Sequence, residues 1–299
     1  MVARPGSGAC DHRSMTTGTL ITVAPTGAES SKADVPALPV TLAELVATGS
    51  ECEALGASVI HVHIRDDQAR PTLDLGRLRD TVAALRAETN LIVQLSTGGA
   101  VTDPESDRLR VVDAAPDMAS CTMGTVNFGD DVFLNRWQFI VALHTRMQDA
   151  AVVPEYEIFD LGHLTTLSRL LDKHGLPYGG HVHVDLVTGV PGGMPATTEA
   201  LVACLSAIRD LPAGTTFSAT GVGRGTLPVM LASLSAGGHL RVGMEDTLTY
   251  AKGQPVDSNM QLVARAAGFA RLAQRPPLTP DEARALLGVA PKVPAASPA

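Results

Sequence analysis

The sequence predicts an α/β fold, a TIM (β/α)8 barrel that forms a single domain. Short β-type runs alternate with longer helical patterns eight times along the chain, and eight parallel strands close a barrel that has no free edge. The chain has 299 residues, 45% of them hydrophobic, which is enough to bury one core of this size. A doubly wound sheet is the alternative, but its G-x-G-x-x-G should follow the first strand, where this chain has only APTGAES.

The predicted strands are short and mostly rich in β-branched residues. In chain order they are Thr19–Ala24, Ser58–Ile64, Leu91–Ser96, Met118–Thr122, Val152–Phe159, His181–Val187, Thr215–Thr220 and His239–Val242. The β-type pattern is weakest in the fourth.

Helical patterns follow these strands in turn. In chain order they are Leu42–Leu55, Leu73–Glu88, Pro104–Ala114, Val132–Gln148, Leu161–His174, Thr197–Arg209, Leu227–Ala236 and Ser258–Ala273. Thr41 and Glu44 have the spacing of a capping box, and Thr102 or Asp103 is predicted to cap the helix that begins at Pro104.

The two ends of the chain lack such patterns. Residues 1–17 are rich in Gly, Ser and Arg and are not periodic, so we expect a disordered tail, and Met15 is an alternative start to Met1. Residues 291–299 read PKVPAASPA, and because proline cannot continue a helix, we expect a second tail there. The barrel domain is expected over residues 18–290.

Charge and composition argue against several classes of partner. The chain has 23 Lys and Arg against 31 Asp and Glu, a net charge of -8, and it lacks the basic stripe that a phosphate backbone requires. Its four cysteines form no CxxC pair, which favours a reducing cytoplasm. No apolar run approaches the roughly 18 to 20 residues that span a bilayer. We therefore expect a cytoplasmic protein that binds neither nucleic acid nor membrane.

Polar side chains gather on the predicted strands and at their ends, and the carboxyl ends of barrel strands are where active sites lie. They are Glu29, His61, His63, Ser96, Thr97, Ser120, Thr122, Glu155, Glu157, His181, His183, Gly221 to Arg224, Arg241, Glu245 and Asp246. Such a concentration of titratable groups argues against a non-catalytic barrel that serves only as a scaffold.

His61 and His63 indicate a metal site most directly. Residues i and i+2 of a strand point to the same face, so both imidazoles could bind one ion. Zinc in an open catalytic site takes about three protein ligands, and Glu245 could supply the third. The alternative is that the histidines only make hydrogen bonds inside the barrel. His181 and His183 repeat the spacing, so one of the two pairs is a decoy if only one binds metal.

Three further groups have both a functional and an ordinary interpretation. The hydroxyls of Ser96 and Thr97, which precede two glycines, could hold a carboxylate or phosphoryl oxygen, or could belong to a plain turn. Glu155 and Glu157 share a face, so they could bind a cation, move protons or form salt bridges. Arg241 could hold Asp246 as a positioned base, or both could belong to a surface ion network.

Eight segments of the chain together resemble the β-keto acid cleavage enzyme family. They are APTGAES, VIHVHIRD, QLSTGGA, MGTVNFGDDVF, PEYEIFD, GVPGGM, GVGR and GGHLRVGMED, in the family's order, and the resemblance extends from Thr19 to Val289. It implies a TIM barrel, commonly a homotetramer, that binds zinc and reacts a β-keto acid with acetyl-CoA. The implied products are acetoacetate and a new acyl-CoA, so the protein would be an acyltransferase.

The resemblance also implies roles for individual residues. The zinc ligands would be His61, His63 and Glu245, and the base would be Asp246 assisted by Arg241. Glu157 is the third candidate catalytic residue. Substrate-positioning residues would be Ser96 and Ser120, the latter a Thr in many relatives, and Thr122 occupies a wall position that varies among them. Glu29 and Glu157 match acidic positions near the distal part of the keto acid, which favours a cationic or hydrogen-bond-donating tail.

Two other enzyme classes stay open. A zinc hydrolase barrel also uses H-x-H, but usually on the first strand with further histidines and a lysine, whereas here the motif is on the second strand. A metal-dependent aldolase shares the carbanion chemistry, but should carry a more convincing phosphate-binding loop than GVGRG and acts without acetyl-CoA.

Overall fold

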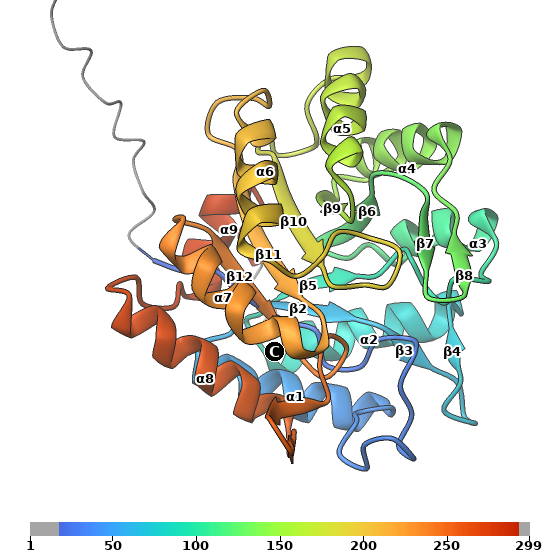
Figure 1. Cartoon of the computed structure of the whole chain (residues 1–299). Helices are drawn as coiled ribbons and strands as arrows, with labels where there is room; N and C mark the ends of the chain where they lie inside the picture. The colour runs from blue at the N-terminus through green and yellow to red at the C-terminus, as the bar shows by residue number, and fades with distance from the viewer. Residues whose placement is uncertain (1–17, 293–299) are drawn as a thin grey trace, which may run out of the picture.

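Eight parallel strands close into one barrel, as the sequence predicts (Figure 1). The computed structural model describes residues 18–292, so both predicted tails lie outside the described residues except for positions 291 and 292. Around the barrel the strand order is β1-β12-β11-β10-β9-β6-β5-β2, and β1 pairs with both β2 and β12. The chain therefore passes once around the barrel in sequence order.

Every predicted strand contains or overlaps one barrel strand. The barrel strands are β1 (Ile21–Val23), β2 (Val59–Val62), β5 (Ile92–Leu95), β6 (Met118–Thr122), β9 (Val153–Ile158), β10 (His183–Thr188), β11 (Thr216–Gly221) and β12 (His239–Val242). Their side chains alternate between two layers. On β9, for example, the Tyr156 hydroxyl meets His144 of the outer helical layer, while its neighbours Glu155 and Glu157 contact side chains of other barrel strands.

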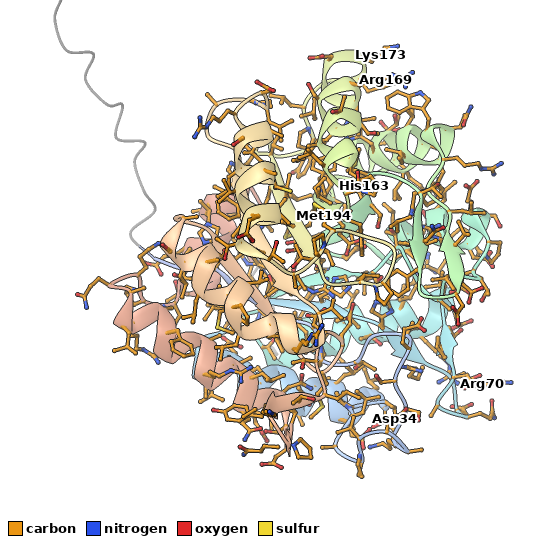
Figure 2. All side chains as sticks on the ribbon, in the orientation of Figure 1. Asp34, Arg70, His163, Arg169, Lys173 and Met194 are labelled. Carbon is orange, nitrogen blue, oxygen red and sulfur yellow. The ribbon has the colours of Figure 1, made fainter. Side chains whose placement is uncertain are left out.

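Helices surround the barrel on the outside (Figure 1). They are α1 (Leu42–Leu55), α2 (Leu75–Glu88), α3 (Glu105–Arg110), α4 (Trp137–Asp149), α5 (Leu161–His174), α6 (Thr198–Ile208), α7 (Thr226–Ser235) and α8 (Asn259–Leu272), with short 3-10 turns η1 (Val111–Ala114) and η2 (Gly223–Gly225). Each buries one stripe of side chains. On α5, His163 lies against the protein body, whereas Arg169 and Lys173 are exposed (Figure 2).

The predicted helix starts are right in one case and wrong in another. Thr41 and Glu44 form the expected capping box of α1. The predicted cap of α3 is wrong, because Pro104 occupies the cap position without a side-chain bond. The Asp103 carboxylate instead accepts a hydrogen bond from the Ala100 N–H, 2.8 Å away. The Asp103 side chain therefore stabilises the turn before the helix and does not cap the helix.

Short hairpins in the loops were not predicted. They are β3 (Ile64–Arg65) with β4 (Pro71–Thr72), β7 (Val126–Phe128) with β8 (Asp131–Phe133), and β13 (Thr249–Ala251) with β14 (Gln254–Pro255). The helix predicted from Val132 therefore begins only at Trp137, because Val132 is paired in β8. All three hairpins follow barrel strands at the carboxyl end.

Helix α9 (Pro280–Leu287) packs against the opposite end of the barrel. Its residues Ala283 and Leu287 pack in one buried cluster with residues from the amino-terminal ends of the strands, among them Leu20 and Val59. Thr279 and Glu282 form a capping box with proline at the helix start, a local pattern that is typical of a helix beginning. Within residues 18–292 no helix combines the length and apolar character needed to cross a membrane.

Candidate active site

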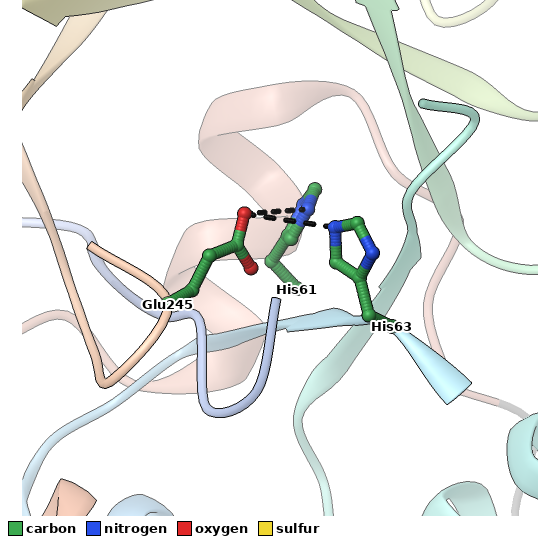
Figure 3. A group of neighbouring side chains, drawn as sticks. All are labelled: His61, His63 and Glu245. Carbon is green, nitrogen blue, oxygen red and sulfur yellow. Dashed lines mark ion pairs between the residues drawn. The ribbon is translucent and has the colours of Figure 1, made fainter. Parts of the chain in front are cut away.

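His61, His63 and Glu245 converge at the carboxyl end of the barrel (Figure 3). His61 lies on β2 and His63 directly follows it, while Glu245 lies in the loop after β12. One carboxylate oxygen, Oε1, is 3.8 Å from His61 Nε2 and 3.6 Å from His63 Nε2. The potential ligand atoms all lie within 4.8 Å of one another, and no other such cluster occurs among the described residues. The three side chains could hold one metal ion.

The donor set and its electrostatics fit a divalent cation. Burial, with the charge of Arg241, lowers the pKa of His61 to about 4, so at neutral pH the imidazole has the uncharged form that binds metals. Burial alone would raise the pKa of Glu245, but Arg241 and the two histidines hold it well below its usual range. Glu245 Oε2 is buried and has no hydrogen-bond partner, which a bound cation would supply. Two imidazoles and a carboxylate are typical ligands of catalytic zinc.

Arg241 and Asp246 lie beside this cluster and are paired. The Asp246 carboxylate accepts hydrogen bonds from Arg241 Nε at 3.2 Å and Nη2 at 3.1 Å. Nη2 also contacts Glu245 at 2.5 Å, and Nη1 lies 3.6 Å from Glu157. Burial raises the pKa of Asp246 to about 6 despite the opposing charge of Arg241. The pair is a buried part of the site, so the interpretation as a surface ion network is wrong.

Two neighbouring loops are tied together so that Glu245 faces the histidines. Asn259, the first residue of α8, accepts a bond from the Met244 N–H and donates one to the Pro25 carbonyl. Gly27 has a left-handed backbone with φ +64°, and a Cβ there would lie 2.7 Å from Glu245 Cγ. Arg65 donates to the carbonyls of Gly27 and Ser30. Sequence analysis missed Asn259 and Arg65, since their partners are distant in the chain.

Gly243 should tolerate no side chain, because it allows β12 to approach the end of β1. An alanine Cβ would lie 1.9 Å from the backbone oxygen of Ala24, which also accepts the hydrogen bond of the Glu245 N–H. We expect Gly243→Ala to lower the free energy of unfolding by about 1–3 kcal/mol, as overpacking does, measured by chemical denaturation.

Gly268→Ala is the matched control for this substitution. Gly268 lies within α8 and its added Cβ would meet nothing within 4 Å. Alanine is favoured over glycine in helices by about 1 kcal/mol, so this variant should be as stable as the original chain or more stable. Equal stability of the two variants would contradict the packing argument.

A cavity of about 230 Å³ opens above the cluster. Its polar floor contains the three potential ligands with Arg241 and Asp246, and Glu29, Ser96 and Glu157 also line it. The remaining wall is largely apolar and includes Val101, Phe128, Phe133, Phe159, Val187 and Val190. Phe128 and Phe133 come from the unpredicted β7–β8 hairpin, so this wall was missing from the sequence analysis.

Ser120 and Thr122 of β6 are buried and lie behind the cavity lining. The Ser120 hydroxyl accepts a hydrogen bond from the Thr97 N–H at 3.1 Å, next to Ser96. The Thr122 hydroxyl donates to Glu157 Oε2 at 2.6 Å. The Ser120 hydroxyl therefore holds the backbone next to Ser96, and the Thr122 hydroxyl holds the side chain of Glu157.

His181 and His183 lie at the other end of the barrel interior. His183 is the first residue of β10, and His181 precedes the strand. Both contact the Thr216 hydroxyl at 2.7 Å. Grouping these two histidines with the residues at the carboxyl ends of the strands is wrong, because β10 begins at His183 and both side chains lie at its amino-terminal end. Neither belongs to a metal-binding cluster in the described part of the chain.

A closed barrel in which three side chains that could hold a metal ion lie with a buried Arg–Asp pair under a cavity has the arrangement of a TIM-barrel enzyme site. The family model described as "beta-keto acid cleavage enzyme" matches residues 19–289. The chain belongs to this family, as its sequence motifs predicted. The expectation that it is an enzyme of the acyltransferase class is confirmed by this match together with the names of the curated relatives described next.

Three curated relatives show how the family varies. The chain is 38% identical to the "3-keto-5-aminohexanoate cleavage enzyme" of Acetoanaerobium sticklandii, over 90% of this chain and 98% of the relative. It is 33% identical to the "3-oxoadipate:acetyl-CoA acetyltransferase" of Cupriavidus necator, over 92% and 96%. It is 30% identical to the "3-dehydrocarnitine:acetyl-CoA trimethylamine transferase" of Rhizobium meliloti, over 91% and 96%.

Among solved structures, the chain is similar to the "Apo structure of ObcA", with a TM-score of 0.73 and 19% sequence identity. The similarity covers 85% of this chain and 66% of that one. At this identity the likeness concerns the fold alone.

Proposed function

We propose that this protein is a zinc-dependent β-keto acid cleavage enzyme that uses acetyl-CoA and releases acetoacetate and a new acyl-CoA. The observation that carries the proposal is the convergence of His61, His63 and Glu245 beside the Arg241–Asp246 pair under a small-molecule cavity. The named activities of the relatives support the same reaction type. By family membership, we also propose a homotetramer in the cytoplasm.

The residues that would hold zinc are His61, His63 and Glu245. When bound, the ion would supply a positive charge that stabilises the negative charge formed when a β-keto acid loses a proton from the carbon between its carboxylate and its ketone. Ser96 lines the cavity, and its hydroxyl would donate to the substrate carboxylate. Ser120 and Thr122 would act indirectly, through Thr97 and Glu157.

Asp246 would act as the base. Burial raises the pKa of its carboxyl to about 6, which makes the carboxylate a better proton acceptor than an ordinary aspartate while it stays charged at neutral pH. Arg241 holds both carboxylate oxygens, and the contact of Arg241 with Glu157 fixes the guanidinium from its other side. Asp246 would remove the proton from the substrate carbon and later return it to the product.

The remaining steps balance without a redox partner. The substrate carbanion attacks the thioester carbonyl of acetyl-CoA, a carbon–carbon bond forms and the CoA thiolate leaves. The thiolate then attacks the former ketone carbon of the keto acid. The bond between this carbon and the carbon that attacked acetyl-CoA breaks. The released carbanion takes the proton from Asp246 and becomes acetoacetate, while the former ketone carbon becomes the carbonyl of the new thioester.

The acidic residues of the cavity favour a cationic tail on the keto acid. Glu29 is exposed at the cavity, and Glu157 presents a second carboxylate deeper inside. The aromatic wall of Phe128, Phe133 and Phe159 suits an amino or trimethylammonium group as well, because cations are attracted to ring faces. An anionic tail would meet the like charge of Glu29 at the cavity.

The test is to incubate the zinc-loaded protein with acetyl-CoA labelled with ¹³C in both acetyl carbons and β-keto acids with cationic, neutral and anionic tails. We expect a new CoA thioester, fastest with a cationic tail, with the label in acetoacetate and none in the thioester. A chelator should abolish the reaction and zinc should restore it.

Each alternative has its own outcome in this experiment. Unlabelled cleavage products without acetyl-CoA would favour the aldolase, and hydrolysis of a different substrate class would favour the hydrolase. A thioester that still forms after complete metal removal, confirmed by elemental analysis, would disprove the zinc dependence but keep the acyl transfer.

A further inference from the structure

We propose that Gln94 and Glu155 are positioning residues that hold His61 with its Nδ1 protonated and its Nε2 free to bind metal. The inference rests on the metal site proposed above. It concerns a row of buried polar side chains in which His61, Gln94 and Glu155 are joined by hydrogen bonds, and Glu155 contacts His183 at the amino-terminal end of β10. Neither residue lines the cavity.

The first link of the row joins neighbouring strands. His61 on β2 is paired in register with Gln94 on β5, and His61 Nδ1 lies 2.5 Å from Gln94 Oε1. Both side chains are fully buried. An amide oxygen only accepts hydrogen bonds, so the proton of the neutral imidazole must be on Nδ1. His61 Nε2, which faces Glu245, is then left as the ligand atom.

The second link decides which way the Gln94 amide points. Gln94 Nε2 donates to Glu155 Oε2 at 2.9 Å. Since a carboxylate only accepts, the amide nitrogen must face Glu155 and the amide oxygen must face His61. If the amide rotated by half a turn, its NH₂ would face His61 Nδ1. The imidazole would then carry its proton on Nε2, which could not bind a metal ion.

The third link keeps Glu155 charged. Burial alone would raise the pKa of Glu155, but His183 and Arg241 bring it below its usual value. His183 Nε2 lies 3.5 Å from Glu155 Oε1, and its Nδ1 contacts the Thr216 hydroxyl at 2.7 Å. His183 and Thr216 therefore anchor the row at the amino-terminal end. A primary amide does not readily pass a proton along, so the row orients His61 and is not a proton path.

Zinc affinity tests the proposal, with Zn²⁺ alone in competition with a chromophoric chelator. Loss of an outer partner of a metal ligand typically weakens binding about 10–100-fold, and we expect this for Gln94→Leu and Glu155→Leu. Glu155→Gln keeps an oxygen that can accept from Gln94, so it should restore most of the affinity that Glu155→Leu loses.

Tyr156→Phe is the matched control, because it removes one buried hydrogen bond from the same strand on its outer face, that of Tyr156 with His144 at 2.9 Å. It should leave zinc affinity unchanged. A folded Gln94→Leu variant that binds zinc as tightly as the original chain, or an equal loss in Tyr156→Phe, would overturn the proposal.

A second readout does not depend on metal at all. In metal-free protein with ¹⁵N-labelled histidine, two-bond ¹H–¹⁵N correlations report which ring nitrogen carries the proton. The original chain should show His61 protonated at Nδ1 only, and Gln94→Leu should show both tautomers. If the chain bound no zinc but gave this result, the proposed metal site would fail while the positioning of His61 stood. An Nε2-protonated His61 in the original chain would refute the positioning itself.

Discussion

Replacing Glu245 by glutamine is expected to remove zinc from the protein and to abolish turnover while the barrel stays folded. Glutamine lacks the negative charge with which Glu245 faces both His61 and His63, and a neutral amide is a poor zinc ligand. Arg241 keeps Asp246 and Glu157 as partners, so the fold should survive. Metal content by elemental analysis, circular dichroism and the thioester assay measure the three effects.

One outcome for Glu245→Gln would contradict this prediction. If Glu245→Gln retained one zinc per chain and normal turnover, Glu245 would have no place in the metal site. If the variant lost its fold, zinc binding would be measured instead on Glu245→Asp, which keeps the charge but shortens the side chain, and weaker binding is expected there.

Replacing Asp246 by asparagine should slow turnover at least about a hundredfold, the contribution typical of a positioned base, while zinc stays bound. Asparagine has nearly the same shape and its oxygen can still accept a bond from Arg241, but the amide cannot take up a proton. The neighbouring Glu245→Gln variant is the natural comparison, because it should lose metal and activity together, whereas Asp246→Asn should lose activity alone.

Steady-state kinetics over a range of substrate concentrations separate an effect on kcat from an effect on KM. A fall in kcat with little change in KM indicates a group that acts in the reaction step rather than in binding. Turnover at the original rate, with zinc bound, would place the base elsewhere in the cavity, and Glu157 would then be the next carboxylate to test.

The architecture could be predicted because each of its elements has a local pattern. β-branched runs and amphipathic helices recur in strict alternation, and even the weakest predicted strand, Met118–Thr122, matches β6 residue for residue. The family motifs allowed the site residues to be chosen from one sequence. His61 with His63 and Arg241 with Asp246 are close in the chain, so strand geometry and short loops could bring each pair together.

Other features depend on which segments meet across the barrel. Gln94 and Glu155 are 61 positions apart, and nothing near either residue indicates that their side chains are hydrogen-bonded. Asp185 is another example, because no local pattern indicates that its side chain is buried. Its carboxylate accepts a hydrogen bond from the Thr220 hydroxyl, and burial raises the pKa of the carboxyl well above its usual range. In the sequence these residues cannot be distinguished from other polar residues, because their partners lie on other strands of the barrel.

By itself the sequence determined the order and type of the barrel elements, the family, and the pairs of chemical groups that are neighbours in the chain. Tertiary structure alone decided that Gln94 joins His61 to Glu155, that His183 lies at the opposite end from His61, and that Ser120 lies behind the cavity. The physical reason is that periodicity encodes which side of a strand is buried, whereas strand pairing determines its depth in the barrel and its neighbours.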